Sequence, residues 1–155
     1  MIIKTPVVLD VSHWKTIPDF KAISPRPVLM ITKATEGLDF VDNTFVTYFQ
    51  GMQEAGYLRG CYHFFNGFDG AAQARHFLNT IKNYVTQKDL LILDVEFAGA
   101  DAAQMQAWFD VVRAAYPNNH LLLYSRRNIL ESVLLTASQK EYFKKISVWV
   151  AGYPT

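Results

Sequence analysis

Short, almost continuously apolar runs recur along the chain and alternate with segments whose apolar residues repeat at helical spacing. Each run is rich in β-branched and aromatic residues, which is typical of strands buried on both faces of a parallel sheet. The runs predict strands at residues 6–11, 27–33, 59–65, 90–96, 120–125 and 146–151.

The segments between these strands predict helices. Residues 101–116 begin with an N-cap residue, Asp101, and end before Pro117. Helical spacing also predicts helices over residues 43–56, 70–85 and 127–144, with a short helical turn within 17–24. Strands that alternate with helices indicate an α/β fold with a parallel sheet and right-handed crossovers, here five β/α units and a sixth strand.

Polar and aromatic side chains gather where these strands end. In parallel α/β folds the carboxyl ends of the strands meet at one edge, and ligands bind there. Asp94 and Glu96 end one strand, and Asp10 ends the first. The other candidate substrate-binding residues near strand ends are Lys33, Glu36, Tyr62, Phe64, Tyr124, Trp149 and Tyr153.

Asp94 and Glu96 give the most specific chemical signal. Residues two apart on a strand point to the same face, with Cα atoms roughly 6.5–7 Å apart. Carboxyl groups about 5–5.5 Å apart suit retaining glycosidases and about 6.5–9.5 Å inverting ones, so the pair indicates glycoside hydrolysis without defining its stereochemistry. Glu96 has the longer side chain and is the better candidate for the general acid, and its acidic neighbour favours retention of a proton there.

Two other interpretations compete with catalysis by these acids. In the first, Asp94 and Glu96 belong to a buried ion network with Lys33 or an arginine. In the second, they join Asp10 and His63 as oxygen and imidazole ligands of a divalent metal. We favour catalysis without a metal or other cofactor, because His63 is expected to face the helices and a third acid ends the first strand.

Composition narrows the class of partner. The net charge of +1, without clusters of Lys and Arg, provides no basic surface to attract nucleic acid. The chain's 155 residues predict one domain, and its single cysteine, Cys61, excludes an internal disulfide and a cysteine-based zinc site. The first apolar run is far too short for a signal peptide, and no segment has the length of a transmembrane helix, so we expect no membrane contact.

At these residues the chain resembles glycoside hydrolase family 25, the Chalaropsis-type lysozymes, many of which are phage endolysins. The pieces occur in the family's order and cover almost the whole chain. The combination of KATEG, YHF and then DVE is specific. The matching pieces are LDVSHW (9–14), ITKATEGLDFVDNTF (31–45), RGCYHFF (59–65), LILDVE (91–96), LLLYS (121–125) and VWVAGY (148–153).

The resemblance implies an irregular TIM-like β/α barrel and an N-acetylmuramidase, which cleaves the β-1,4 bond between N-acetylmuramic acid and N-acetylglucosamine. By motif, Glu96 is then the catalytic acid, and Asp94 and Asp10 are assisting carboxylates. Tyr62 and Lys33 line the reaction subsite. The implied partner is the glycan strand of bacterial peptidoglycan, reached by phage release or by a secretion route that this sequence does not contain.

The family's domain continues past VWVAGY through further short strands, which this sequence lacks. We therefore expect residues 1–155 to form one catalytic domain, truncated at its C-terminal end, that associates with itself through open sheet edges. The alternatives are a peptidoglycan-binding or inactive truncated module, and another glycan hydrolase such as a chitinase-like enzyme.

Overall fold

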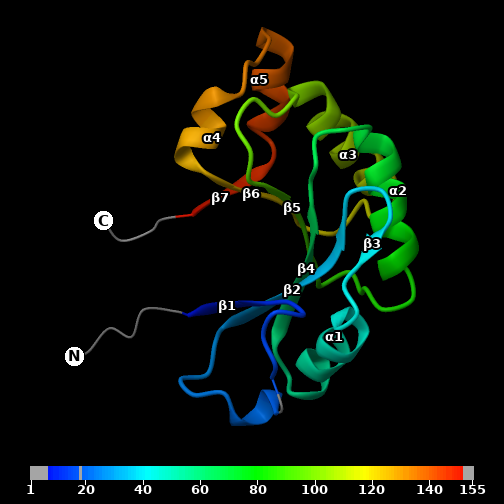
Figure 1. Ribbon diagram of the computed structural model, residues 1–155, viewed down its shortest axis with the longest axis vertical. Helices are drawn as coiled ribbons and strands as arrows, with labels where there is room; N and C mark the ends of the chain where they lie inside the picture. The colour runs from blue at the N-terminus through cyan, green and yellow to red at the C-terminus, as the bar shows by residue number, and fades with distance from the viewer. Residues whose placement is uncertain (1–6, 18, 152–155) are drawn as a thin grey trace, which may run out of the picture.

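A curled, mostly parallel sheet organises the protein. The computed structural model describes residues 7–17 and 19–151. The sheet curves into a half barrel, with β1 and β7 on opposite sides of an opening (Figure 1). The strands follow the order β1-β2-β4-β5-β6-β7, and β3 lies antiparallel beside β2. Their bounds are β1 Val8–Val11, β2 Leu29–Glu36, β3 Phe40–Val41, β4 Leu58–Phe64, β5 Leu90–Val95, β6 Leu121–Arg126 and β7 Ser147–Ala151.

Helices cover the convex side of this sheet (Figure 1). The N-cap predicted at Asp101 is confirmed, because its side chain accepts a hydrogen bond from the backbone N–H of Ala103. Within the described ranges, no helix is both long and apolar enough to cross a membrane. The helices are η1 Phe20–Ala22, α1 Phe45–Glu54, α2 Gly70–Ile81, α3 Ala102–Ala115, α4 Arg127–Ser132 and α5 Ala137–Phe143.

The parallel α/β architecture is confirmed. Several boundaries differ from prediction by a few residues, as at β2 (predicted 27–33) and α2 (predicted 70–85), and two elements differ in kind. The single helix expected over 127–144 is two helices, because Thr136 starts α5 with a capping box that includes Gln139. The short strand β3 was not predicted, since its two residues are too few to produce a periodic signal.

The core lies between the sheet and its helices, and His63 is part of it. His63 is fully buried, and its ring lies 6.1 Å from that of Trp108. The Thr35 hydroxyl donates a hydrogen bond to Nδ1, and Nε2 donates to the side-chain oxygen of Gln73. Burial lowers the pKa of His63 to about 4, so the ring is neutral. The expectation that His63 faces the helices is confirmed.

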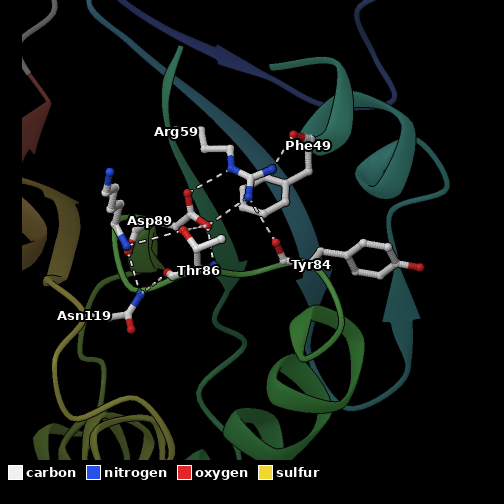
Figure 2. A network of polar contacts seen from close by, with 7 residues as sticks. Phe49, Arg59, Tyr84, Thr86, Asp89 and Asn119 are labelled. Atoms are coloured by element: carbon white, nitrogen blue, oxygen red, sulfur yellow. Dashed lines mark hydrogen bonds and ion pairs between the residues drawn. The ribbon is translucent and has the colours of Figure 1, made fainter. Parts of the chain in front are cut away.

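A buried ion pair ties the beginnings of three strands together (Figure 2). The Arg59 guanidinium donates to both carboxylate oxygens of Asp89, at 2.9 and 3.1 Å. It also donates to the backbone carbonyls of Phe49 and Tyr84, and Asn119 donates to the carbonyl of Asp89. Arg59 lies near the start of β4, and Asp89 and Asn119 just precede β5 and β6. This network therefore stabilises the end of the sheet opposite to the strands' carboxyl ends.

Both outer strands of the half barrel are exposed. Among the described residues, β1 pairs only with β2, and β7 pairs only with β6. Val8, Val148 and Val150 on these strands are exposed. Unpaired edges of this kind invite pairing with another chain, so self-association remains a prediction.

Loss of the Asp89 charge is expected to destabilise the fold strongly. The Asp89→Asn substitution leaves the Arg59 guanidinium buried without its counterion, which should lower the free energy of unfolding by about 3–5 kcal/mol in urea denaturation. Glu141→Gln removes the same charge from the exposed pair with Lys144 and should change stability by less than about 1 kcal/mol. Equal effects of the two substitutions would contradict the structural importance of the network.

Candidate active site

The concave side of the half barrel contains a cavity of about 140 Å³. Side chains two apart on a strand share a face, so alternate residues of the parallel strands point into this space. Two of the predicted acids, Asp10 on β1 and Asp94 on β5, line it. The complete lining is Val8, Asp10, Ile31, Tyr62, Ile92, Asp94, Tyr124 and Trp149.

Asp94 is the most strongly perturbed acid of the site. Its exposed fraction is 7%, and within the described part of the chain its buried Oδ1 atom has no hydrogen-bond partner. Burial, followed by repulsion from Glu96 and then Asp10, raises the pKa of Asp94 to about 8. The carboxyl group therefore holds a proton at neutral pH. The sequence favoured Glu96 as the acid that retains a proton, and the structure adds Asp94 as a carboxyl whose pKa burial raises.

Asp10 belongs to an edge strand and is exposed as a residue, whereas its side chain lines the cavity. Burial of the carboxyl group, followed by repulsion from Glu96, raises the pKa of Asp10 to about 6. Glu96 thus raises the pKa of both aspartates, and Asp10 raises that of Asp94, because the acids lie close together on one side of the sheet. This proximity agrees with the sequence-based expectation that the strand ends meet.

Glu96 follows β5 directly and lies at the rim. Its side chain is 27% exposed, and the Arg126 guanidinium donates to Oε2 at 3.4 Å. Lys33, the expected partner in the alternative ion network, instead pairs with Glu36 at 2.5 Å. Among the described residues Asp94 therefore forms no ion pair, whereas the more exposed Glu96 pairs with Arg126.

The predicted binding residues fall into two groups. Tyr62, Tyr124 and Trp149 line the cavity, and the last two rings meet edge to face with centroids 5.2 Å apart. Burial, with repulsion from Asp10 and Asp94, raises the pKa of Tyr62, which therefore stays a neutral hydroxyl.

The second group lies beside the cavity. The Lys33 amine is 5.2 Å from the centroid of the Phe64 ring and pairs with Glu36. Tyr153 lies outside the described residues. The sequence-based prediction missed three apolar residues that line the cavity, Val8, Ile31 and Ile92. Val8 and Ile92 lie two residues before Asp10 and Asp94, and Ile31 lies opposite Asp10 on β2, so strand geometry could have identified them.

His63 does not join the three acids with which it was considered as a metal ligand. His63 points to the helices and is held by Thr35 and Gln73, as described above. Across residues 7–17 and 19–151, no three His, Cys, Asp or Glu side chains form a group able to hold a metal ion.

The chain belongs to the glycosyl hydrolases family 25, because the sequence model of that family matches residues 9–155. It is 30% identical to the uncharacterized protein YegX of Escherichia coli (strain K12), an alignment covering 94% of this chain and 55% of that protein. It is 29% identical to lysozyme M1 of Streptomyces globisporus, covering 70% of this chain and 41% of that protein. The chain thus spans about half the length of these curated relatives.

A solved structure supports the same assignment. The bacterial lysozyme from Streptomyces coelicolor is 26% identical to this chain, with a TM-score of 0.76. The match covers 97% of this chain and 76% of that one. The similarity therefore extends across the curled sheet and the strands that carry the three acids.

The buried carboxyl of Asp94 is expected to make the protein less stable as the pH rises towards 8. Its pKa is about 8 in the folded protein, against an ordinary value of 3.8. Between pH 3.8 and 8 the folded state holds a proton on Asp94 that the unfolded chain has lost. The free energy of unfolding is therefore highest below about pH 4 and falls as the pH rises to about 8. The slope approaches ~1.4 kcal/mol per pH unit.

Urea denaturation above about pH 6 isolates Asp94 from Asp10, whose pKa is about 6. Asp94→Asn, which is neutral at every pH, should remove the slope between about pH 6.5 and 8. Asp39→Asn makes the same change at an exposed turn and should leave the slope unchanged. A slope that persists in Asp94→Asn would show that another group holds the proton.

Proposed function

We propose that this chain is an N-acetylmuramidase, a lysozyme-type enzyme that cleaves the β-1,4 bond between N-acetylmuramic acid and N-acetylglucosamine in peptidoglycan. The proposal rests on the buried oxygen of Asp94, which has no partner among the described residues, in a cavity that Asp10 and Tyr62 also line. A buried acceptor without a donor is costly unless a ligand satisfies it, and the amide of a 2-acetamido sugar provides a suitable N–H group. Family membership supports the same reaction class.

Asp94 and Glu96 have different roles: Asp94 binds the acetamido group, and Glu96 acts as the general acid. In the free protein Asp94 holds a proton, and Glu96 lies beside Arg126. When the substrate's acetamido N–H donates to Asp94, the ionised form of that carboxyl gains a hydrogen bond. The proton then passes to Glu96, which becomes the general acid. Asp10 adds negative charge near the positive charge that develops on the sugar in the transition state.

Bond cleavage proceeds with assistance from the substrate. Glu96 gives its proton to the glycosidic oxygen as the bond to the anomeric carbon breaks, and the acetamido oxygen forms a bond to that carbon. Water then opens this cyclic intermediate and gives a proton back to Glu96. Because the anomeric carbon is attacked twice from opposite sides, the product retains its configuration. No step requires a cofactor.

The surrounding side chains hold the glycan. Tyr62 is a neutral hydroxyl in the cavity, and Tyr124 and Trp149 offer two rings in contact with each other. Lys33, Glu36 and Phe64 supply charged and aromatic contacts next to it. We propose that residues 1–155 act as one catalytic domain whose partner is the glycan strand of the bacterial cell wall.

Glu96→Gln is expected to lower the rate of cell-wall lysis by about 10²–10⁴-fold, because the amide has no proton of comparable acidity to give to the leaving oxygen. Turbidity of purified walls measures the rate, and co-sedimentation with the walls measures binding, which should persist. Glu141→Gln makes the same substitution on the exposed α5 helix and should retain full lysis. Wall binding by the wild type without any lysis would instead identify a binding module.

A substrate without the N-acetyl group on the sugar at the cleaved bond is expected to resist cleavage, because it lacks both the nucleophilic oxygen and the N–H that Asp94 accepts. Reducing-end release from intact and de-N-acetylated glycan strands tests this, with NMR of the first product giving its anomeric configuration. Efficient cleavage of the de-N-acetylated strands, or an inverted product, would favour direct attack by water.

A further inference from the structure

An exposed tryptophan lies beside the candidate site at the rim of the sheet. Trp14 follows β1 closely, and its exposed fraction is 86%. Single exposed apolar residues are common and need no explanation. Trp14 is different because its ring contacts that of His13, which a buried carboxylate and a further ring hold in position.

Trp14 is the outer member of a continuous row of rings. Its centroid lies 4.5 Å from that of His13, and the His13 ring lies 5.8 Å from that of Phe40. Phe40 is on β3 and is 41% exposed. These three residues, His13, Trp14 and Phe40, form what we call the aromatic platform.

Asp42 fixes the platform in place. This residue is 1% exposed, and its Oδ2 accepts hydrogen bonds from the backbone N–H of His13 at 3.1 Å and from Nδ1 at 2.7 Å. Its Oδ1 accepts from the backbone and the hydroxyl of Thr44, at 2.9 and 2.6 Å. Burial opposes ionisation, but these hydrogen bonds outweigh it and lower the pKa of Asp42. The charged carboxylate therefore holds the segment after β1 against β3.

The platform is continuous with the candidate site. The Lys33 amine lies 5.0 Å from the centroid of Phe40 and 5.2 Å from that of Phe64. On the other side, only four residues of chain lead from Asp10 to Trp14, a length that spans at most ~14 Å. A glycan of a few sugars bound at the acids therefore reaches the platform.

The chemistry of the platform matches a sugar ring. Its rings offer an apolar surface, whereas the Lys33–Glu36 ion pair and Asp10 offer charged, hydrogen-bonding groups beside it. A pyranose matches both, because its axial C–H bonds form an apolar face and its hydroxyl and acetamido groups surround that face. Rigid aromatic rings bind such a face with little loss of conformational freedom. A protein partner would require a far larger apolar area than three rings offer.

We propose that the aromatic platform is a further glycan subsite, in which Trp14 stacks on a sugar of the strand beyond those bound at the acids. The proposal rests on the proposed function, since the strand is the same substrate. Trp14 is then a binding residue, and His13 and Asp42 are positioning residues that hold its ring over the path of the glycan.

Substrates of two lengths test the platform. On long peptidoglycan strands, Trp14→Ala should raise KM about tenfold without changing kcat, because apolar contact with one sugar is lost. On the disaccharide of N-acetylmuramic acid and N-acetylglucosamine, which holds only the cleaved bond and is too short to extend from the acids to the platform, KM should remain that of the wild type. Trp14→Phe keeps a ring and should recover most of the loss. Leu134→Ala removes a side chain that is 92% exposed between α4 and α5, and should match the wild type.

The outcomes separate this proposal from the proposed function. An unchanged KM of Trp14→Ala on long strands overturns the platform, as does an equal increase on both lengths, which a structural role would produce. If the wild type cleaves neither substrate, the proposed function is wrong. Binding of long strands is then measured by calorimetric titration instead of by cleavage. Weaker binding by Trp14→Ala than by Leu134→Ala then supports the platform, and equal binding overturns it.

Discussion

The two-residue alternation of parallel strands is the constraint on which this structure depends. Each strand is covered by helices on one face and faces the cavity on the other, so neighbouring residues meet opposite environments. On β4, Tyr62 faces the cavity, and His63, the next residue, is a neutral core residue bonded to Thr35 and Gln73. A shift of one residue in register would exchange these faces and bring His63 into the acidic cavity. Stability and chemistry therefore depend on the same register.

The two ends of the sheet differ in how their buried carboxyl groups are stabilised. Near the strand starts, the Asp89 carboxylate accepts hydrogen bonds from the Arg59 guanidinium and from the backbone N–H of Thr86. Its charge is therefore compensated, and the network holds three strands together. Near the strand ends, Asp94 has no such partner among residues 7–17 and 19–151, and it retains a proton instead. A carboxyl left in this condition weakens the fold at neutral pH. Under the proposed function, a substrate that offers a donor to Asp94 would remove this cost and so couple binding to chemistry at this residue.

Much of the architecture was predictable because apolar runs and helical spacing are local signals. All six predicted strands are present. Side chains that alternate along the strands, together with the shared edge of a parallel sheet, also explain why five predicted site residues line one cavity: Asp10, Tyr62, Asp94, Tyr124 and Trp149. The location of the proton was not predictable, because it depends on how deeply each carboxyl is buried, and side-chain length says nothing of that. The break between α4 and α5 was missed because apolar spacing continues through the Thr136 capping box.

The platform was missed for a related reason. His13 and Trp14 were adjacent polar and aromatic residues without a partner in the local sequence, and the partner, Asp42, lies 29 residues away. Only β3 brings Asp42 to them, and β3 is too short to produce a pattern. The short antiparallel strand thus has a consequence beyond the sheet: it carries Phe40 to the Lys33 amine and Asp42 to His13, and so connects the rim after β1 with the charged residues of β2. Asp10 and Trp14 lie close in the sequence, but the contacts that hold the platform are tertiary ones, between His13 and Asp42 and between Phe40 and Lys33.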